Sequence, residues 1–289
     1  MNGIIIINKP KNCTSHDIVK QAKKVLKEKV GHTGTLDPNA TGVLPLLIGK
    51  GTEISKYLIN HDKTYEATLQ LGEKRDTADI EGNVIGKMEV KESILQQENV
   101  IRVLKTLVGK QEQIPPIYSA IKINGKKLYE YARKGEDIEI TPRKIEIYDV
   151  ELINIDKENK KIEFRVKCSK GTYIRTLCEE FAKRLGNIGY MRELKRTQVG
   201  EFNIENAINI EELENEETLK NKFITVEQYF SKKNKIDLNE DKLKLFLNGV
   251  QLTYKFPDEI YKIYDIKGKF IGIGTIKNNL LKRDIIIKE

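Results

Sequence analysis

The sequence of 289 residues has no tryptophan and only three cysteines, three methionines and three histidines. The cysteines, which form no CxxC pair, are Cys13, Cys168 and Cys178. An odd number of isolated cysteines argues against a disulfide framework and favours a reducing environment. No apolar run approaches the ~20 residues that cross a bilayer, and residues 1–10 lack the basic region of a secretory signal. We therefore expect a cytoplasmic protein without membrane contact.

Several motifs of metal and nucleotide chemistry are also missing. His16, His32 and His61 are scattered, and there is no HExxH sequence or Cys/His cluster, so we expect no metal. Neither GxxxxGK[ST] nor a GxGxxG after a strand is present, so we expect no nucleotide cofactor. No GxSxG elbow supports a Ser–His–Asp triad, although the sequence alone does not exclude one.

The composition is that of a soluble globular protein, with 39% hydrophobic and 33% charged residues. The length suits about two domains. The formal net charge of +8 favours nucleic acid as a partner, although the excess is small for a chain of this length.

The order of apolar patterns predicts an α+β protein. Residues 3–7 are typical of a strand, and Thr14-Ser15 is typical of an N-cap for a helix over 17–30. Alternating apolar residues predict strands at 65–71 and 161–168, and helical spacing predicts helices at 91–109 and 173–185. Because no regular βαβ rhythm appears, we predict a mixed, largely antiparallel central sheet flanked by helices.

A change in composition near residue 231 indicates a domain boundary. An acidic run at 211–217 and a polar stretch at 231–235 precede a β-rich tail with a predicted hairpin at 261–273. We therefore predict domains at 1–231 and 232–289. The tail contains thirteen Lys/Arg and eight Asp/Glu, so most of the net positive charge belongs to it.

Two segments carry candidate catalytic residues. Residues 31–42 are rich in turn-forming types yet lie between well-formed elements, and such a long loop is more often functional than idle. Asp37 lies in this loop before Pro38, where the commoner role of an Asp-Pro pair is to initiate a turn. Arg175 follows the strand–glycine junction at 167–174, and its commoner role would be an exposed first-turn arginine.

Several ordered motifs resemble one family, the TruB family of bacterial tRNA pseudouridine synthases. The motifs are Asn8-Lys9-Pro10 to Asp17, the segment Gly31-His32-Thr33-Gly34-Thr35-Leu36-Asp37-Pro38, Lys63-Thr64-Tyr65-Glu66, Arg75 to Gly82, Pro115 to Arg133, and Cys168 to Arg175. One difference is Asn12, where the family usually has glycine, and asparagine tolerates a positive φ.

The resemblance implies a fold, an activity and a substrate. The fold would be the pseudouridine synthase fold followed by a small PUA-like module. The reaction would convert uridine 55 in the T-arm of tRNA to pseudouridine by breaking the N1–C1′ bond, rotating the uracil and rejoining it through C5. This isomerisation needs no cofactor, which agrees with the missing motifs. We expect a monomer with no obligate protein partner.

The resemblance also assigns site residues. Asp37 would be the catalytic residue, acting at C1′, at uracil C6 or as a base toward the ribose, and the sequence does not choose among these routes. Arg175 would pair with Asp37 and orient it. Tyr65 would stack on the extruded uracil and accept the C5 proton. The remaining substrate-binding residues would be His32, which wedges into the RNA loop, and the pocket residues Lys9, Pro10, Tyr173 and Leu194.

A basic insertion at about 112–144 is the candidate RNA-binding segment. Between residues 120 and 144 it has seven basic and four acidic residues, interleaved with Tyr129 and Tyr131. Basic groups hold phosphates and aromatic rings hold unstacked bases, although a solvated charged surface would have the same composition. The residues expected to contact RNA are Lys122, Lys126, Lys127 and Arg133.

Two other functions are alternatives to this interpretation, and the sequence has features that argue against each of them. A non-catalytic RNA-binding protein or tRNA-folding chaperone would use the same basic surface, and it would not need Asp37, Tyr65 and Arg175 together. A metal-dependent nuclease would need clustered carboxylates and histidines, which the sequence lacks.

Overall fold

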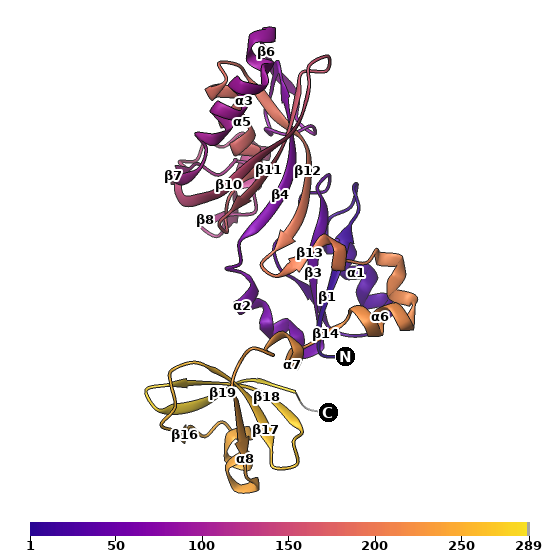
Figure 1. Cartoon of the computed structure of the whole chain (residues 1–289), viewed down its shortest axis with the longest axis vertical. Helices are drawn as coiled ribbons and strands as arrows, with labels where there is room; N and C mark the ends of the chain where they lie inside the picture. The colour runs from indigo at the N-terminus through magenta and orange to yellow at the C-terminus, as the bar shows by residue number, and fades with distance from the viewer. Residues whose placement is uncertain (288–289) are drawn as a thin grey trace.

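A computed structural model describes residues 1–287, so the last two residues of the predicted tail lie outside the described part. The chain forms an elongated molecule in which the segments of the N-terminal two thirds lie above the C-terminal module (Figure 1). The helices are α1 (Ser15–Leu26), α2 (Ser55–Leu58), α3 (Gln97–Lys105), α4 (Leu128–Lys134), α5 (Ile174–Arg184), α6 (Glu216–Lys222), α7 (Val226–Tyr229) and α8 (Glu240–Leu247).

One large sheet runs through the upper two thirds of the molecule. Its strand order is β14-β1-β3-β12-β4-β11-β10-β7, with β2 beside β3 and β13 beside β12. The bounds are β1 (Gly3–Lys9), β2 (Val30–His32), β3 (Thr41–Ile48), β4 (Lys63–Leu71), β7 (Gly109–Gln113), β10 (Arg143–Asp156), β11 (Lys161–Cys168), β12 (Gly189–Val199), β13 (Phe202–Asn203) and β14 (Ile224–Thr225). Within the described residues, its strand pairs are antiparallel except β3 with β12. The predicted α+β class with a largely antiparallel sheet is confirmed.

The first helix begins as predicted but ends earlier. Thr14 caps α1, and Asp17 completes a capping box with it. The helix ends at Leu26 because Lys27 adopts a left-handed conformation with φ of 54°. Val30 instead starts β2 and pairs with Ile48, so the predicted extension of the helix to residue 30 is wrong.

The predicted helix at 91–109 is also wrong as a single element. A 3-10 turn at Glu92–Leu95 precedes α3, because Gln96 between them is extended with φ of −71° and ψ of 134°. Gly109, expected to end the helix, begins β7 with a φ of 118°. The strands predicted at 65–71 and 161–168 correspond to β4 and β11, which pair with each other.

The C-terminal module is a curved five-stranded sheet in the order β15-β17-β18-β19-β16. Its strands are β15 (Lys235–Leu238), β16 (Leu252–Thr253), β17 (Ile260–Asp265), β18 (Phe270–Lys277) and β19 (Leu280–Ile286). The predicted hairpin is β17 and β18. Ile273 and Ile285 pack in one apolar cluster with Ile4, Ile54 and Phe230, so the module shares a core with the rest of the chain.

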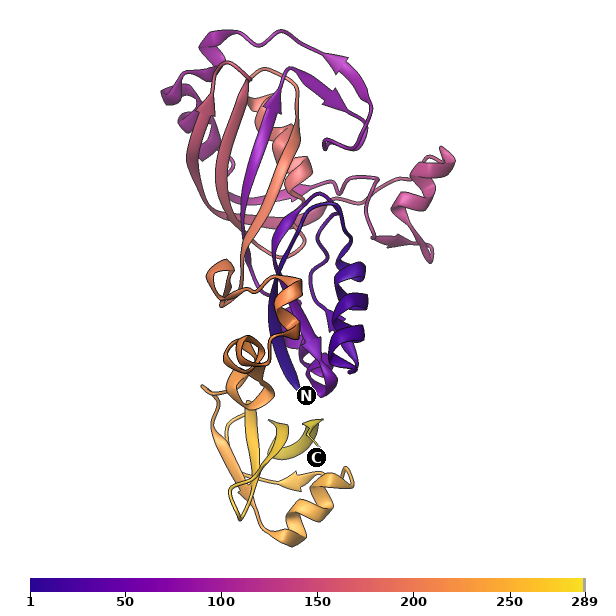
Figure 2. The same ribbon diagram turned by 90° about the vertical axis from the view of Figure 1, so that its right-hand side faces the viewer.

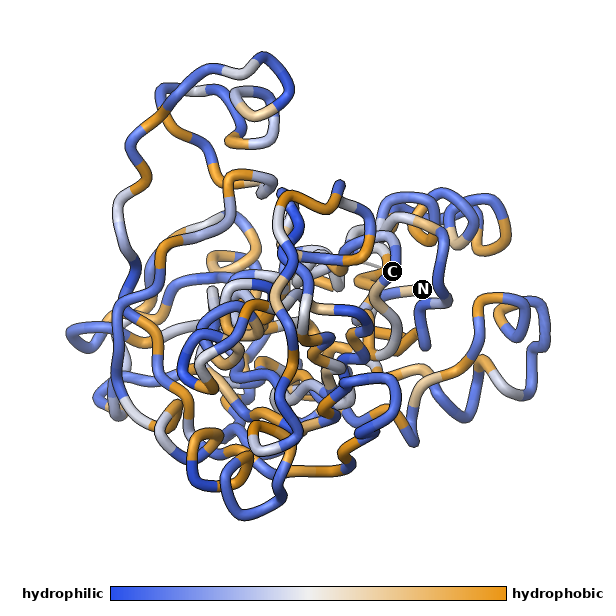
Figure 3. The backbone as a smooth tube through the Cα atoms, turned by 90° about the horizontal axis from the view of Figure 1, so that it is seen from above, coloured by the Kyte–Doolittle hydropathy of each residue, from blue (hydrophilic) through white to orange (hydrophobic). Residues whose placement is uncertain are grey.

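Two smaller hairpins project from the large sheet. They are β5 (Glu73–Arg75) with β6 (Val84–Lys87), and β8 (Lys122–Ile123) with β9 (Lys126–Lys127). In the turned view, the second hairpin and α4 stand away from the body of the molecule (Figure 2). Seen from above, the loops that project outward are mainly hydrophilic (Figure 3). None of the helices within residues 1–287 is long and apolar enough to cross a membrane.

Candidate active site

Asp37 lies in the loop of residues 33–40 between β2 and β3. Its carbonyl accepts a hydrogen bond from the amide of Ala40 at 3.0 Å, so the backbone does form the turn that an Asp-Pro pair favours. The hydroxyl of Ser15 holds Leu36 on both sides, accepting from its amide at 2.9 Å and donating to its carbonyl at 3.1 Å. The carboxylate is left to contact other groups, with its side chain 43% exposed.

Lys9 anchors this loop through hydrogen bonds to backbone carbonyls. The side chain is fully buried, and its ammonium donates to the carbonyls of Pro10 and Cys13 at 2.8 Å each and of Pro38 at 3.0 Å. Burial lowers the pKa of Lys9. Lys9 and Pro10 were predicted to contact the substrate, but neither lines the cavity beside Asp37 that is described below. Lys9 instead supports the loop that carries Asp37.

Arg175, near the start of α5, bridges two carboxylates. Its Nε lies 3.3 Å from Oδ2 of Asp37, and its Nη1 lies 3.4 Å from Oδ2 of Asp79. Its Nη2 also donates to the carbonyl of Tyr118 at 2.9 Å. Nη1 also donates to the carbonyl of Thr77 at 3.4 Å. The side chain of Arg175 is 8% exposed, and these four contacts together set the orientation of its guanidinium. The pairing with Asp37 is the one that the resemblance implied.

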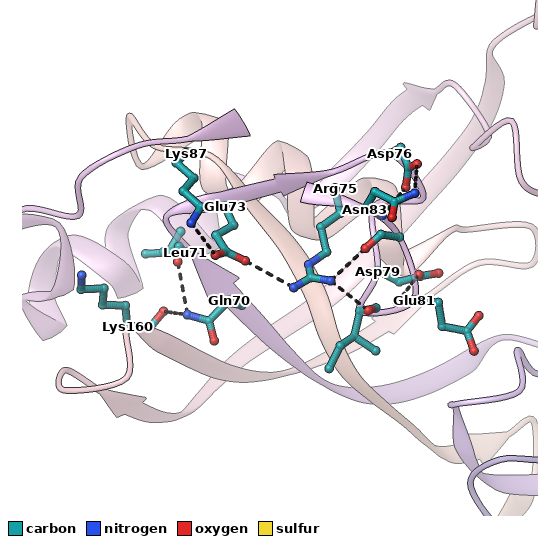
Figure 4. Close-up of polar contacts among 12 residues, drawn as sticks. Gln70, Leu71, Glu73, Arg75, Asp76, Asp79, Glu81, Asn83, Lys87 and Lys160 are labelled. Atoms are coloured by element: carbon teal, nitrogen blue, oxygen red, sulfur yellow. Dashed lines mark hydrogen bonds and ion pairs between the residues drawn. The ribbon is translucent and has the colours of Figure 1, made fainter. Parts of the chain in front are cut away.

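Asp79 belongs to a loop whose shape depends on Arg75 (Figure 4). Arg75 Nη1 donates to the carbonyls of Ile80 and Gly82 at 3.1 and 2.8 Å, and the hydroxyl of Thr77 donates to Asp79 Oδ1 at 2.6 Å. The sequence reasoning included this loop among the matched motifs but did not choose Asp79. A pattern cannot show that Asp79 reaches Arg175, which lies 96 positions later in the chain.

A cavity of about 400 Å³ opens beside Asp37. The predicted residues Asp37, Tyr65, Tyr173, Arg175 and Leu194 all line it. Tyr65 is 8% exposed and Leu194 is 9% exposed, so an aromatic ring and an aliphatic side chain form nearly buried walls. The cavity therefore combines one carboxylate with apolar surfaces that suit a flat ring.

Arg196 is a site residue that the sequence reasoning missed. It is 1% exposed, and its guanidinium donates to the carbonyl of Val43 at 2.8 Å and of Gly34 at 2.7 Å. Its positive charge also interacts with the phenol of Tyr65. Burial raises the pKa of Tyr65, and Arg196 opposes that shift. Strand alternation could have found Arg196, because it lies two positions after Leu194 on β12 and therefore on the same face.

The structure does not bring His32 into the lining of the cavity. It lies at the end of β2 and is half-buried, and burial and Arg196 lower its pKa. Its buried Nδ1 has no hydrogen-bond partner among the described residues.

The basic insertion contributes to the cavity only through residues that precede its projecting hairpin. Ala120 and Ile121 line the cavity, whereas the predicted RNA-binding side chains lie on the projecting β8–β9 hairpin and α4. Several of these cations already lie over tyrosine rings, with Lys126 Nζ 4.2 Å from the Tyr131 centroid and Arg133 5.3 Å from the Tyr129 centroid. Lys126 also pairs with Glu136 at 2.6 Å. Within residues 1–287, no group of three or more metal-ligating side chains is placed to hold an ion.

Solved structures define the class of this fold. The chain superimposes on one described as "Crystal Structure of a Cbf5-Nop10-Gar1 Complex" with a TM-score of 0.67 and 25% identity, covering 99% of this chain and 84% of that one. Another, described as "Structure of H/ACA RNP bound to a substrate RNA containing 2'-deoxyuridine", has a TM-score of 0.69 and 23% identity, covering 99% and 85%, and shows the shared fold. The family model that matches residues 22–174 describes a pseudouridylate synthase, so the fold shared with these structures is that of the pseudouridine synthases.

Family profiles and curated relatives narrow the class to a family. Residues 22–174 match "TruB family pseudouridylate synthase (N terminal domain)", and residues 175–232 match "tRNA pseudouridylate synthase B C-terminal domain". Proteins named tRNA pseudouridine synthase B are similar over nearly their whole length. That of Clostridium tetani is 44% identical over 95% of both chains, and that of Clostridium acetobutylicum is 42% identical over 98% of both. The chain belongs to the TruB family.

Proposed function

We propose that this chain converts uridine 55 in the T-arm of tRNA to pseudouridine, with Asp37 as the catalytic carboxylate. One observation carries the assignment of the site: Asp37 lines a cavity whose walls include Tyr65, and its Oδ2 pairs with Nε of Arg175 at 3.3 Å. The relatives named tRNA pseudouridine synthase B support the substrate and the reaction.

The reaction requires the target base outside the RNA stack. A uridine stacked within a folded loop does not present C1′ or C6 to a carboxylate that lines a cavity, so the nucleotide has to be extruded into the cavity. Asp37 then acts at C1′, at uracil C6 or as a base toward the ribose. In each route the N1–C1′ bond breaks, the uracil rotates, C5 bonds to C1′, the C5 proton leaves and N1 takes up a proton, so the number of protons is unchanged. Reactant and product are isomers, so no redox partner takes part.

The neighbours of Asp37 position the reacting groups. Arg175 fixes the carboxylate because the same guanidinium is held by Asp79. Tyr65 stacks on the extruded uracil and accepts the C5 proton, while Leu194 and Tyr173 limit the space in which the freed base rotates. Lys9 acts as a positioning residue through its hydrogen bond to Pro38.

RNA contacts outside the cavity extend over two regions. We assign them to the insertion at about 112–144 and to the C-terminal module from residue 232. The insertion projects from the body of the molecule (Figure 2), its residues Ala120 and Ile121 line the cavity, and the module carries an excess of basic residues. We place the enzyme in the cytoplasm, acting as a monomer on tRNA.

The substitution Asp37→Asn tests the proposal, because it removes the carboxylate and keeps the shape. We expect no pseudouridine at position 55 of unmodified tRNA, mapped by chemical derivatisation and primer extension, while tRNA affinity stays within about threefold because the basic surface is intact. Asp149→Asn, the same change at an exposed position of β10 outside both proposed RNA-contact regions, serves as the matched control and should leave activity unchanged.

Product formation by Asp37→Asn at the wild-type rate would contradict the assignment. A wild-type protein that binds and refolds tRNA without forming pseudouridine would instead identify a tRNA-folding protein. The projecting insertion is compatible with such a second activity, and the same tRNA samples report both outcomes.

A further inference from the structure

The charges that line the cavity do not balance. Asp37 is its one lining carboxylate among the described residues, whereas the lining cations are Lys63, Lys170, Arg175 and Arg196. Arg175 is paired with Asp37, and Arg196 is used by carbonyls and a phenol. Two cations, Lys63 and Lys170, are therefore left over in a cavity that would receive one nucleotide.

Lys63, at the start of β4, has no carboxylate partner. Its ammonium donates to the carbonyl of His61 at 2.5 Å. No Asp or Glu oxygen within residues 1–287 lies within 4.0 Å of the Lys63 ammonium, so Lys63 forms no ion pair there. The charged and titratable groups that face it are Arg196 from β12, Cys168 from β11, Lys170 from the loop before α5 and Asp62 from its own segment. Asp62 already accepts a hydrogen bond from the phenol of Tyr148 at 3.1 Å.

Lys170 stands at the exposed edge of the same cavity. Its ammonium donates to Oδ1 of Asn60 at 2.5 Å, and like Lys63 it forms no ion pair in the described part of the chain. Each lysine thus keeps one neutral oxygen partner and has donors to spare. Two such cations repel each other unless an anion lies between them.

The anion that accompanies an RNA nucleotide into a cavity is its own phosphodiester. Uracil and ribose are neutral, so an extruded uridine brings charge only through its flanking phosphates. We propose that Lys63 and Lys170 form a phosphate-binding subsite that holds a phosphodiester flanking the extruded uridine. The proposal rests on the proposed function, because it assumes that a nucleotide of RNA enters this cavity.

The titration of Lys63 agrees with such a role. Burial, together with the positive charge of Arg196, lowers the pKa of Lys63 to about 8. In the free protein its charge is present below this pH and is lost as the pH rises through it. A bound phosphate would favour the charged form, so RNA binding should weaken between pH 7 and pH 9. An arginine at position 63 would remain charged throughout this range.

The test combines a protein change with the matching RNA change. In the Asp37→Asn background, which leaves the RNA unconverted, binding is measured to a T-arm stem-loop and to stem-loops with one neutral methylphosphonate 5′ or 3′ of the target uridine. We expect Lys63→Met to weaken binding about tenfold, one methylphosphonate to weaken it by a similar factor, and the two together to cost little more than either alone. Lys167→Met, on the opposite face of neighbouring β11, removes the same charge outside the cavity and should leave the methylphosphonate effect intact.

Independent, multiplicative losses from the two changes would overturn the proposal. Lys63→Arg provides a second readout, since it should retain affinity at pH 7 and lose the decline between pH 7 and pH 9. Lys170→Met changes an exposed residue and repeats the cycle if Lys63→Met does not fold. Pseudouridine formation by the wild-type protein is scored separately, so its absence would refute the proposed function, whereas normal activity with multiplicative losses would refute the subsite alone.

Discussion

Tyr65 and the buried Arg196 both line the cavity, and the phenol of Tyr65 interacts with the positive charge of Arg196. Its ring provides a stacking surface, and its hydroxyl can exchange a proton. Burial keeps the pKa of Tyr65 raised, so the phenol is protonated in the free protein. In the proposed reaction it first passes this proton to N1 of the freed uracil, and the phenolate, stabilised by the adjacent positive charge of Arg196, then accepts the C5 proton.

Tyr65→Phe should separate these two roles. The ring remains, so we expect the variant to bind tRNA within about threefold of wild type, while single-turnover pseudouridine formation slows by about a hundredfold or more because the proton acceptor is lost. Rapid-quench measurements give the rate, and filter binding gives the affinity. A variant with an unchanged rate would leave Tyr65 with the stacking role alone.

Arg196 links the loop that carries Asp37 to β3 through its hydrogen bonds to the carbonyls of Gly34 and Val43. Arg196→Met would leave the buried carbonyl of Val43 and the part-buried carbonyl of Gly34 without their donor, so we expect the free energy of unfolding to fall by about 2 kcal/mol or more. Urea denaturation measures this loss. The control is Arg165→Met, which removes an exposed arginine from surface ion pairs with Glu66 and Glu151 and should cost about 1 kcal/mol or less. Equal losses would show that Arg196 contributes no more than a surface cation.

The junction of β3 and β12 depends on a close approach of two backbones. Gly42 has a φ of 100°, and a Cβ added there would lie 2.1 Å from the carbonyl oxygen of Arg196. A glycine at this position therefore permits the parallel pairing that brings the Asp37 loop against the strand that carries Leu194 and Arg196.

Gly42→Ala should destabilise this junction. We expect the free energy of unfolding to fall by about 3 kcal/mol, because both the positive φ and the collision oppose the methyl group. The matched control is Gly31→Ala in β2, where the nearest atom would be 3.6 Å away and the conformation is ordinary. Thermal unfolding compares the two variants. Equal midpoints would contradict the close-approach argument.

Helix and strand ends show where periodicity stops being informative. The strands at β4 and β11 follow from alternation because each has one face on the core. The end of α1 and the break before α3 depend instead on the backbone conformations of Lys27 and Gln96. Such single-residue conformations leave the apolar spacing unchanged, so the sequence predicted longer helices than the structure contains.

The C-terminal module is attached through a shared apolar seam. Ile273 and Ile285 of the module pack against residues of β1, α2 and α7, and Asp284 of the module contacts Lys56 and Tyr57 of α2. The phenol of Tyr264 donates to Glu227 at 2.6 Å across the same seam. These contacts join the module to the part of the chain that contains the cavity.

Ile285→Ala should loosen this seam. We expect a loss of about 3 kcal/mol in unfolding free energy, because Ile285 is fully buried. Amide hydrogen exchange followed by mass spectrometry should show faster exchange in α2 and β1 as well as in the module. Leu281→Ala, a similar deletion in the module's own core, should raise exchange within the module. A response to Ile285→Ala confined to the module would show that the two parts are not coupled.

Much of the site could be predicted from local chemistry. Short stretches of consecutive residues predict the turn around Asp37, the capped start of α1 and the alternation of β4. The order of the motifs along the chain indicated the family. These features depend on propensities and hydrogen bonds between near neighbours along the chain.

The partners of these residues could not be predicted in the same way. The contact of Asp79 with Arg175, that of Arg196 with Tyr65 and the absence of an ion pair at Lys63 depend on the register of the packed strands. The register of β3, β4, β11 and β12 joins positions 91 to 154 residues apart. Register follows from how the whole core packs, and no local pattern carries it. Consecutive residues thus specify which groups the site contains, whereas the packed sheet specifies which of them meet and where unbalanced charge remains.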